Sequence, residues 1–319
     1  MPKVSVIIPV YGVEKYIERC AHTLFQQTLD DIEYIFIDDC SPDNSIPVLK
    51  RILAEYPNRT NQVVIHRMQK NSGQAKVREW GMKNASGDYI IHCDSDDWID
   101  LNMYEEMYTL AIDSESDIVY CDYIIEGGLN DKKRYYRKVN GLSKDELMER
   151  LLTTSSLNSL WSALVRRTLI DKISFPEGNQ SEDKTMLIQL VWYADKVIGI
   201  DKAFYHYVDN PTSITNAVSP EKIELRASQI FSNVDLILSF LQKENIMHRY
   251  KRFLCAYLFN AKSIYFILLS EPKFYSMWKL KYKEFTKYYL FDPYIHWKVK
   301  IVTLLKLCKS VKILLFDEK

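Results

Sequence analysis

Short apolar runs alternate with amphipathic stretches along the first 120 residues of the chain. The runs hold few polar residues, which is typical of strands buried on both faces of a parallel sheet. We expect these strands at Val4–Val10, Tyr34–Ile37, Val63–Ile65, Tyr89–Ile91 and Ile118–Tyr120. Helices are predicted between them, at Glu14–Gln27, Ser45–Tyr56, Gly73–Asn84 and Leu101–Asp113. This alternation predicts an α/β domain built on a parallel sheet.

The pattern changes after residue 120 and becomes helical from residue 220. A charged stretch, Asp131–Lys138, is predicted to be a hairpin or an exposed loop. Apolar residues then recur at steps of three and four, which predicts a buried helical stripe. The stripe consists of Ile223, Ala227, Ile230, Val234, Ile237 and Leu241. We therefore expect an α/β domain over residues 1–218 and a helical domain over residues 219–319.

Residues 298–316 are predicted to form an amphipathic basic helix at the end of the chain. Its lysines, Lys306, Lys309 and Lys312, share one face, and its leucines and valines share the opposite one. Residues 271–319 hold 11 lysines against 5 acidic residues. Two interpretations stay open, namely contact with an anionic membrane surface and packing of the apolar face on the helical domain. No uncharged apolar run is long enough to predict a membrane-spanning helix.

Composition and charge exclude several classes of protein. The 42 basic and 42 acidic residues give a formal net charge of zero, so no chain-wide basic footprint for nucleic acid is present. The six cysteines form no CxxC pair and no zinc-like spacing with histidine, and we expect them to be reduced. With only 9 glycines in 319 residues, glycine-rich phosphate loops are not expected to be common.

Carboxylates gather where apolar strands end. In Asp94-Ser95-Asp96 the two carboxylates point to the same side of an extended segment, because side chains alternate with a period of two. Such a pair suits a hard divalent cation, Mg²⁺ or Mn²⁺, with phosphates and water completing its shell. For Asp97 and Asp100, capping of the following helix is the better interpretation.

Two further acidic groups have competing interpretations. Asp38 and Asp39 follow an expected strand and either open a turn towards Ser41 or bind a nucleobase through an imide N–H. The Ser181-Glu182-Asp183 segment follows an apolar segment, residues 173–175, that we expect to be a strand. By itself, Ser-Glu-Asp is also a common helix start.

Taken together, these motifs resemble glycosyltransferase family 2, an inverting family with the GT-A fold, over about residues 3–215. The matching motifs are the opening strand Val4–Tyr11, the donor-base motif Ile37–Ser45, a nucleotide-side motif from Asn71, the metal motif Asp94–Asp97 and the catalytic pair Glu182–Asp183. The chain departs from the family pattern at three places. Cys40 stands where glycine is common, Glu79-Trp80 where asparagine and a small residue are usual, and Val208 where arginine is common.

The resemblance implies a fold and a set of site residues. The fold is α/β with a mixed, mainly parallel sheet and a C-terminal helical extension. Asp183 would be the general base, with Glu182 beside it, and Asp96 and His206 would bind Mn²⁺ or Mg²⁺. His206 is equally compatible with a structural role. The residues expected on the side of the nucleotide-diphospho-sugar, most often a UDP-sugar, are Pro9, Tyr11, Asp38, Asp39, Asn71, Gly73, Arg78, Asp94 and Ser95.

The same resemblance implies a metal-dependent enzyme that acts on a growing cell-surface polysaccharide or a lipid-linked glycan. The expected location is the cytoplasm, where residues 298–316 would contact the inner face of the cell membrane. Trp161 either stacks on an acceptor sugar or belongs to the core. The alternative function is a catalytically degenerate GT-A fold that serves as a nucleotide-sugar binding or assembly module.

Overall fold

The structure is a computed structural model, and it describes residues 1–127, 131–209, 219–269, 271–287 and 289–305. Each strand and helix expected in the first 120 residues is present, with small shifts at the ends. The strands are β1 (Val4–Val10), β2 (Ile32–Asp38), β3 (Val63–Arg67), β4 (Tyr89–His92) and β6 (Ile118–Glu126). The helices are α1 (Ile17–Phe25), α2 (Ser45–Leu53), α3 (Gln74–Asn84) and α4 (Met103–Asp113).

The sheet is mixed rather than purely parallel. Its order is β3-β2-β1-β4-β8-β6-β9-β5, and β7 pairs with β6 at one side. Strands β1 to β4 pair in parallel, but β8 (Ala163–Arg166) runs antiparallel to both β4 and β6. The expectation of a parallel sheet is therefore corrected to the mixed sheet that the GT-A resemblance implied.

Three other strands complete the sheet: β5 (Trp98–Ile99), β7 (Lys133–Tyr135) and β9 (Val197–Val208). The β6–β7 pair confirms the hairpin expected at the charged stretch. The strand expected at residues 173–175 is wrong. A 3₁₀ helix, Arg167–Lys172, precedes this segment. The Gln189 side chain forms hydrogen bonds with both the N–H and the C=O of Ser174, so these backbone groups do not pair with a neighbouring strand.

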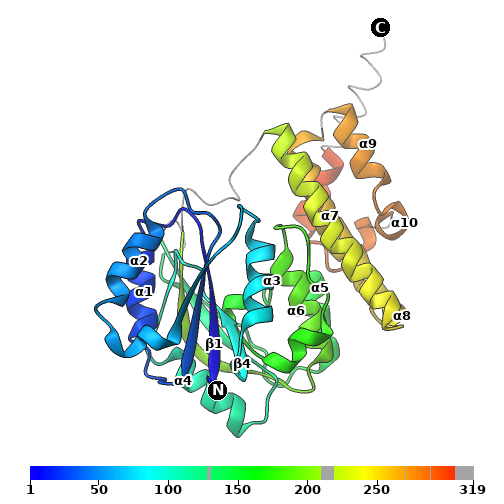
Figure 1. Ribbon diagram of the computed structural model, residues 1–319. Coiled ribbons are helices and arrows are strands. Elements are labelled where there is room, and N and C mark those ends of the chain that lie inside the picture. The colour runs from blue at the N-terminus through cyan, green and yellow to red at the C-terminus, as the bar shows by residue number, and fades with distance from the viewer. Residues whose placement is uncertain (128–130, 210–218, 270, 288, 306–319) are drawn as a thin grey trace.

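The C-terminal region is helical, as expected. After α5 (Lys144–Thr153) and α6 (Glu182–Tyr193) come α7 (Pro220–Lys243), α8 (Met247–Lys262), α9 (Pro272–Leu280) and α10 (Lys283–Thr286). The apolar stripe of α7 is buried, except for Ile230, which is half-buried. Helix α7 packs on α6, and α8 packs on α5 (Figure 1). The placement of a domain boundary near residue 218 stays a prediction.

The side chains of the strands divide between two cores. Along β1, Ile7 belongs to one core, whereas Val6 and Ile8 belong to the other, as the period of two requires. Residues of α1, α2 and α4 line the core on one face, and residues of α3, α5 and α6 line the other, which continues into α7 and α8. The five cysteines in the described part of the chain are free thiols. No helix there is long and apolar enough to cross a membrane.

Candidate active site

The carboxyl ends of β1, β2 and β4 bring the first site residues together. Val10 pairs with Asp38 in the β1–β2 register, and the Asp39 N–H donates to the carbonyl of Val10 at 3.0 Å. The Ser95 hydroxyl donates to the carbonyl of Pro9 at 2.6 Å. Parallel strands therefore place these segments at one edge of the sheet, where ligands of open α/β sheets bind.

Asp38 and Asp39 are buried and hold loops in place. Asp38 accepts from the Ser41 N–H at 2.7 Å, which confirms the turn predicted there, and it pairs with Arg67 at 2.6 Å. The two oxygens of Asp39 accept from the N–H groups of Ser72 and Gly73, at 2.7 and 2.8 Å. Asp39 thus ties the donor-base motif to the nucleotide-side motif. Among the other expected donor-side residues, Tyr11 and Asn71 are exposed at this edge.

Gly73 occupies a position that only glycine fits well. Its φ is +82°, and an added Cβ would lie 2.0 Å from the side-chain nitrogen of Asn179. Asn179 also accepts from the Ala75 N–H at 2.9 Å, at the first turn of α3. Nothing in the sequence singled out Asn179. Its contacts connect the nucleotide-side motif to the segment that leads into Glu182.

Arg78 joins three carboxylates at the centre of the site. This fully buried side chain on α3 contacts Asp94 at 2.8 Å, Glu182 at 2.9 Å and also Asp183. Glu182 and Asp183 lie more than 100 positions away along the chain, at the start of α6. The fold therefore brings the Asp94 motif and the Glu182–Asp183 pair together through one guanidinium.

The charge balance of this cluster alters its protonation. Burial would lower the pKa of Arg78, but the carboxylates of Asp183, Asp94 and Glu182 outweigh that effect and raise it. Burial, together with the Asp183 charge, raises the pKa of Glu182 to about 8. Burial also raises the pKa of Asp183, although Arg78 opposes the shift. Because two neighbouring buried carboxylates share one cation, the pair is expected to keep a proton near neutral pH.

The second oxygen of Asp183 is oriented by the backbone. The Leu160 N–H, in a short 3₁₀ helix (Leu160–Ser162), donates to Asp183 at 3.2 Å. The neighbouring Trp161 is 6% exposed and stacks on Tyr205 at a ring distance of 4.1 Å. This burial favours the core interpretation of Trp161 over stacking on a sugar.

Asp97 and Asp100 do not cap α4. The first helical residue of α4 follows Asn102, which makes no capping hydrogen bond through its side chain. Asp97 instead accepts from the Tyr205 hydroxyl at 2.6 Å and from the Val208 N–H at 2.8 Å. The capping expectation is wrong because these carboxylates find partners on β9, more than 100 residues later.

His206 lies between two carboxylates. Its Nε2 is 3.1 Å from Asp100, its Nδ1 is 3.4 Å from Glu126, and its ring stacks on Trp98 at 3.5 Å. The Trp98 indole N–H also donates to Glu126 at 2.8 Å. This network links β5, β6 and β9 and favours the structural interpretation of His206; metal binding by this residue stays a prediction.

The Asp94–Asp97 segment fits a divalent cation through the chemistry of its donors. Asp94 gives one oxygen to Arg78, and Asp97 is held by β9, whereas Asp96 is half-buried at the strand end. Burial and the charges of Asp94 and Asp96 raise the pKa of Asp97, because three carboxyl groups lie close together at this edge. The described residues hold no group of three or more His, Cys, Asp or Glu side chains that could bind a metal. Phosphates and water would therefore supply most of the ligands, as Mg²⁺ commonly requires.

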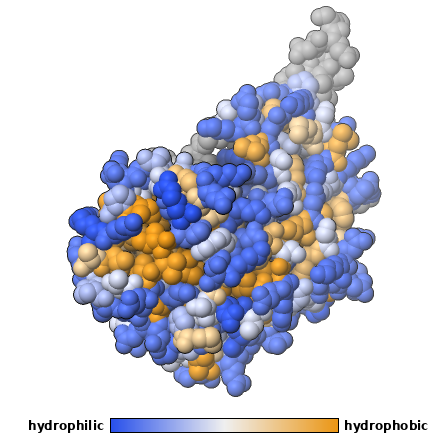
Figure 2. Space-filling view, viewed as in Figure 1, coloured by the Kyte–Doolittle hydropathy of each residue, from blue (hydrophilic) through white to orange (hydrophobic). Residues whose placement is uncertain are grey.

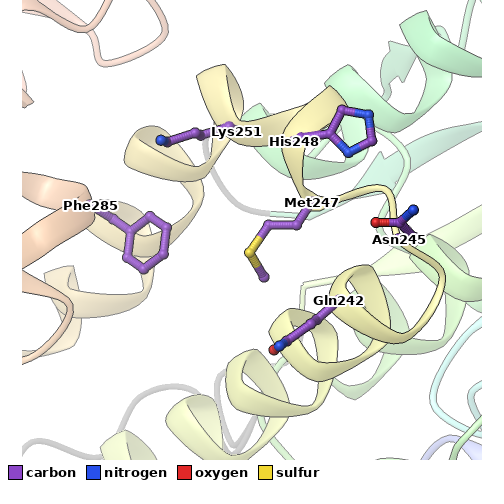
Figure 3. Close-up of a pocket in the computed structure, with 6 residues that line it drawn as sticks. All are labelled: Gln242, Asn245, Met247, His248, Lys251 and Phe285. Atoms are coloured by element: carbon purple, nitrogen blue, oxygen red, sulfur yellow. The ribbon is translucent and has the colours of Figure 1, made fainter.

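A separate cavity of about 420 Å³ lies in the helical region (Figure 3). It is lined by Gln242, Asn245, Met247, His248, Lys251 and Phe285. These residues come from the α7–α8 junction, α8 and α10, and none belongs to the cluster around Arg78. The cavity is therefore distinct from the strand-end site.

Comparisons with known proteins agree with the geometry. The model of the family described as glycosyl transferase family 2 matches residues 5–174. The chain is 31% identical to the putative glycosyltransferase EpsH of Bacillus subtilis over 280 residues, 85% of this chain and 78% of that protein. It is 29% identical to a cholesterol galactosyltransferase of Borreliella burgdorferi over 300 residues, 88% of this chain and 81% of that protein.

A solved structure shows the same fold. TarS of S. aureus, residues 1–349 in complex with UDP-GlcNAc, superposes with a TM-score of 0.58 at 20% identity. The superposition covers 90% of this chain and 91% of that one, so it includes the helical region as well as the α/β part.

Proposed function

The chain belongs to glycosyl transferase family 2, and on that premise we propose that it transfers a sugar from a nucleotide-diphospho-sugar to an acceptor hydroxyl, with inversion. The observation that carries the proposal is the contact of Arg78 with Asp94, Glu182 and Asp183. It joins the proposed donor side of the site to a carboxylate pair with raised pKa values. A UDP-sugar is the donor we propose, and the UDP-GlcNAc complex of TarS supports that choice.

Asp183 is the proposed general base. Its carboxylate would take the proton of the acceptor hydroxyl while that oxygen forms a bond to the anomeric carbon. The bond between that carbon and the phosphate oxygen breaks, and its electron pair leaves with the nucleoside diphosphate. The raised pKa of Asp183 makes it a better proton acceptor than an ordinary carboxylate. One displacement on the face opposite the leaving group inverts the anomeric centre.

Glu182 and Arg78 are proposed to position the base. Arg78 holds both carboxylates, and the Leu160 N–H fixes the second oxygen of Asp183. This arrangement limits how the Asp183 carboxylate can rotate, which supports a fixed direction towards the acceptor. The raised pKa of Glu182 means that it keeps its proton at pH values where most carboxylic acids have lost theirs.

The remaining donor-side residues would bind the nucleotide at the strand ends. Asp38, Asp39 and Gly73 shape the loops that face the base, and Ser95 and Pro9 fix the start of the metal motif. Exposed Tyr11 and Asn71 are the residues proposed to touch the nucleotide directly.

Asp96 is the proposed protein ligand of Mn²⁺ or Mg²⁺. A bound cation would act as a Lewis acid on the diphosphate and stabilise the charge that develops on the leaving group. The grouping of three carboxyl groups within residues 94–97 supports this assignment, because carboxylate oxygens are ligands that Mg²⁺ and Mn²⁺ prefer. His206 is the weaker candidate, because both of its ring nitrogens already face carboxylates.

The acceptor class that we propose is a hydroxyl on a growing glycan or on a membrane lipid. The Borreliella relative is a cholesterol galactosyltransferase, which supports a lipid or lipid-linked acceptor, and the alignment with it covers most of this chain. The matching location is the inner face of the cell membrane. The competing function is a degenerate fold that binds nucleotide-sugars without transfer.

Hydrolysis of the donor by water tests the proposal without knowledge of the acceptor. A panel of UDP-sugars with Mn²⁺ is followed by NMR, and the first sugar released is expected to have the anomeric configuration opposite to that of the donor. Release with the same configuration would overturn the inverting mechanism. Metal-dependent UDP binding with no turnover of any donor, even with added glycan acceptors, would favour the binding-module alternative.

A further inference from the structure

Exposed apolar side chains concentrate near the C-terminus of the described chain. Sixteen large apolar side chains are exposed among the described residues, and nine of them lie between residues 280 and 305. They are Leu280, Leu290, Phe291, Trp297, Val299, Ile301, Val302, Leu304 and Leu305. We call this set the C-terminal apolar surface. Clusters of exposed apolar side chains commonly mark interaction sites.

The last described helix, residues 297–305, contributes six of the nine. Trp297 and Leu305 are each about 60% exposed, and only Thr303 among the nine residues of this helix is buried. The helix therefore packs on the rest of the protein through a narrow side and exposes apolar residues on several others. In water this exposure is unfavourable, and burial against another apolar medium would remove it.

The same stretch is basic. Residues 271–305 contain seven lysines and three acidic residues. Three of the lysines are paired with carboxylates, Lys273 with Glu224, Lys281 with Asp235 and Lys287 with Glu284.

Lys279, Lys283 and Lys298 are exposed and make no ion pair with a described carboxylate. On the face seen in Figure 2, apolar residues lie among polar ones on the lobe that contains α7 and α9. Exposed tryptophan, phenylalanine and leucine next to unpaired lysines is the composition of protein surfaces that bind anionic bilayers.

We propose that the C-terminal apolar surface docks on an anionic lipid bilayer. The aromatic and aliphatic side chains, Phe291 and Trp297 first among them, insert into the interface between headgroups and acyl chains. Lys279, Lys283 and Lys298 contact the anionic headgroups. The described helix lies on the bilayer and does not span it. A second copy of this chain is the competing occupant, but a two-fold interface would press two patches of the same positive net charge against each other.

This surface overlaps the tail predicted at residues 298–316, since four of its nine apolar residues precede that segment and five lie within it. Of that tail, the structure describes residues 298–305, and Lys306, Lys309 and Lys312 lie outside the described residues. The docking proposal does not depend on the proposed catalytic roles, since none of its residues contacts the cluster around Arg78.

Cosedimentation with vesicles tests the proposal on the full chain. The wild type is expected to sediment with vesicles that contain phosphatidylglycerol and much less with vesicles of phosphatidylcholine alone. Added salt should weaken the binding, because it screens the lysines. Each lysine near an anionic surface increases the partitioning of a protein onto the membrane by a factor of about five. The vesicle affinity of K279Q/K283Q/K298Q should therefore be about 100-fold lower than that of the wild type. The matched control K15Q/K50Q/K222Q removes three exposed lysines elsewhere and should bind like the wild type.

A second variant tests the apolar part. F291S/W297S should lose vesicle binding while keeping the melting temperature, since both side chains are exposed. Absence of wild-type binding to anionic vesicles at low salt would overturn the proposal, as would equal binding to both vesicle types. Concentration-dependent dimerisation that F291S/W297S abolishes would identify a second copy as the occupant and would also overturn it. An Asp183→Asn protein should bind vesicles normally, so the lipid result and the catalytic result can fail separately.

Discussion

Replacing Arg78 with glutamine would remove the only cation that contacts Asp94, Glu182 and Asp183 in the described residues. The Arg78 side chain is 2% exposed, and those of Glu182 and Asp183 are 9% and 16% exposed. Water can therefore compensate little for the lost charge. Glutamine keeps part of the volume and two hydrogen-bond donors, so the change isolates the charge rather than the packing.

The loss of folding stability expected for Arg78→Gln follows from the burial of this cluster. Removing one partner of a buried ion pair destabilises a protein by about 3–5 kcal/mol, because the remaining charge stays uncompensated. For a chain of this size, 1 kcal/mol corresponds to a shift of about 2–4 °C in melting temperature, so Arg78→Gln should melt about 10 °C below the wild type.

The cost should also depend on pH. In the wild type the pKa values of Glu182 and Asp183 are raised above their unfolded values, so the folded state binds more protons than the unfolded state. Their contribution to stability is therefore lost as the pH rises through these folded pKa values. Without Arg78 the pKa values of both carboxyl groups rise further. The difference in melting temperature between variant and wild type should therefore be small near pH 5 and largest near pH 8.

Thermal unfolding at pH 5, 6.5 and 8, followed by circular dichroism, measures this gap. The matched control is Arg51→Gln, which breaks an exposed pair with Glu18 and should shift the melting temperature by less than about 4 °C, since exposed pairs contribute at most about 1 kcal/mol. Equal losses for the two variants, or a gap for Arg78→Gln that does not change with pH, would refute the reasoning.

Two further substitutions probe the donor side. Asp96→Asn should weaken Mn²⁺-dependent UDP binding, measured by calorimetry, by at least about tenfold, because an amide is a poorer metal ligand than a carboxylate. The melting temperature should stay unchanged, because the side chain is half-buried at a strand end. Unchanged metal-dependent affinity would refute the ligand assignment. Gly73→Ala should lower the free energy of unfolding by about 1–3 kcal/mol, because its φ of +82° is strained for a residue with a Cβ, and denaturant titration showing no loss would contradict that geometry.

The strands and helices of the first 120 residues could be predicted because their signals are local. Apolar runs such as Val4–Val10 and amphipathic stretches such as Ser45–Leu53 carry their periodicity within a few residues. The α7 stripe was predictable for the same reason. The direction of β8 was not, since antiparallel pairing with β4 and β6 depends on how the chain returns to the sheet after residue 153.

The site was predictable in its parts but not in its connections. The motif resemblance pointed to Asp94, Glu182 and Asp183 and expected Arg78 beside the nucleotide, which stays a prediction, but it did not anticipate that Arg78 contacts all three carboxyl groups. The contact of Arg78 with Asp183 joins residues 105 positions apart, and no spacing rule anticipates it. The expected cap at Asp97 failed for a related reason, because a tertiary partner, Tyr205, took the carboxylate that a local rule assigned to the helix.

The central claim is that Asp183, and not its neighbour, accepts the acceptor proton. The most direct measurement compares donor affinity and turnover in Asp183→Asn with those in Glu182→Gln, which replaces the other carboxyl group held by the same Arg78 with an amide. We predict that Asp183→Asn keeps the affinity for UDP-sugar and loses turnover by about 10²- to 10⁴-fold, the usual contribution of a general base. Glu182→Gln should lower turnover by less than about tenfold. A Glu182→Gln enzyme with the larger loss of turnover, or an Asp183→Asn enzyme that no longer binds the donor, would contradict the assignment.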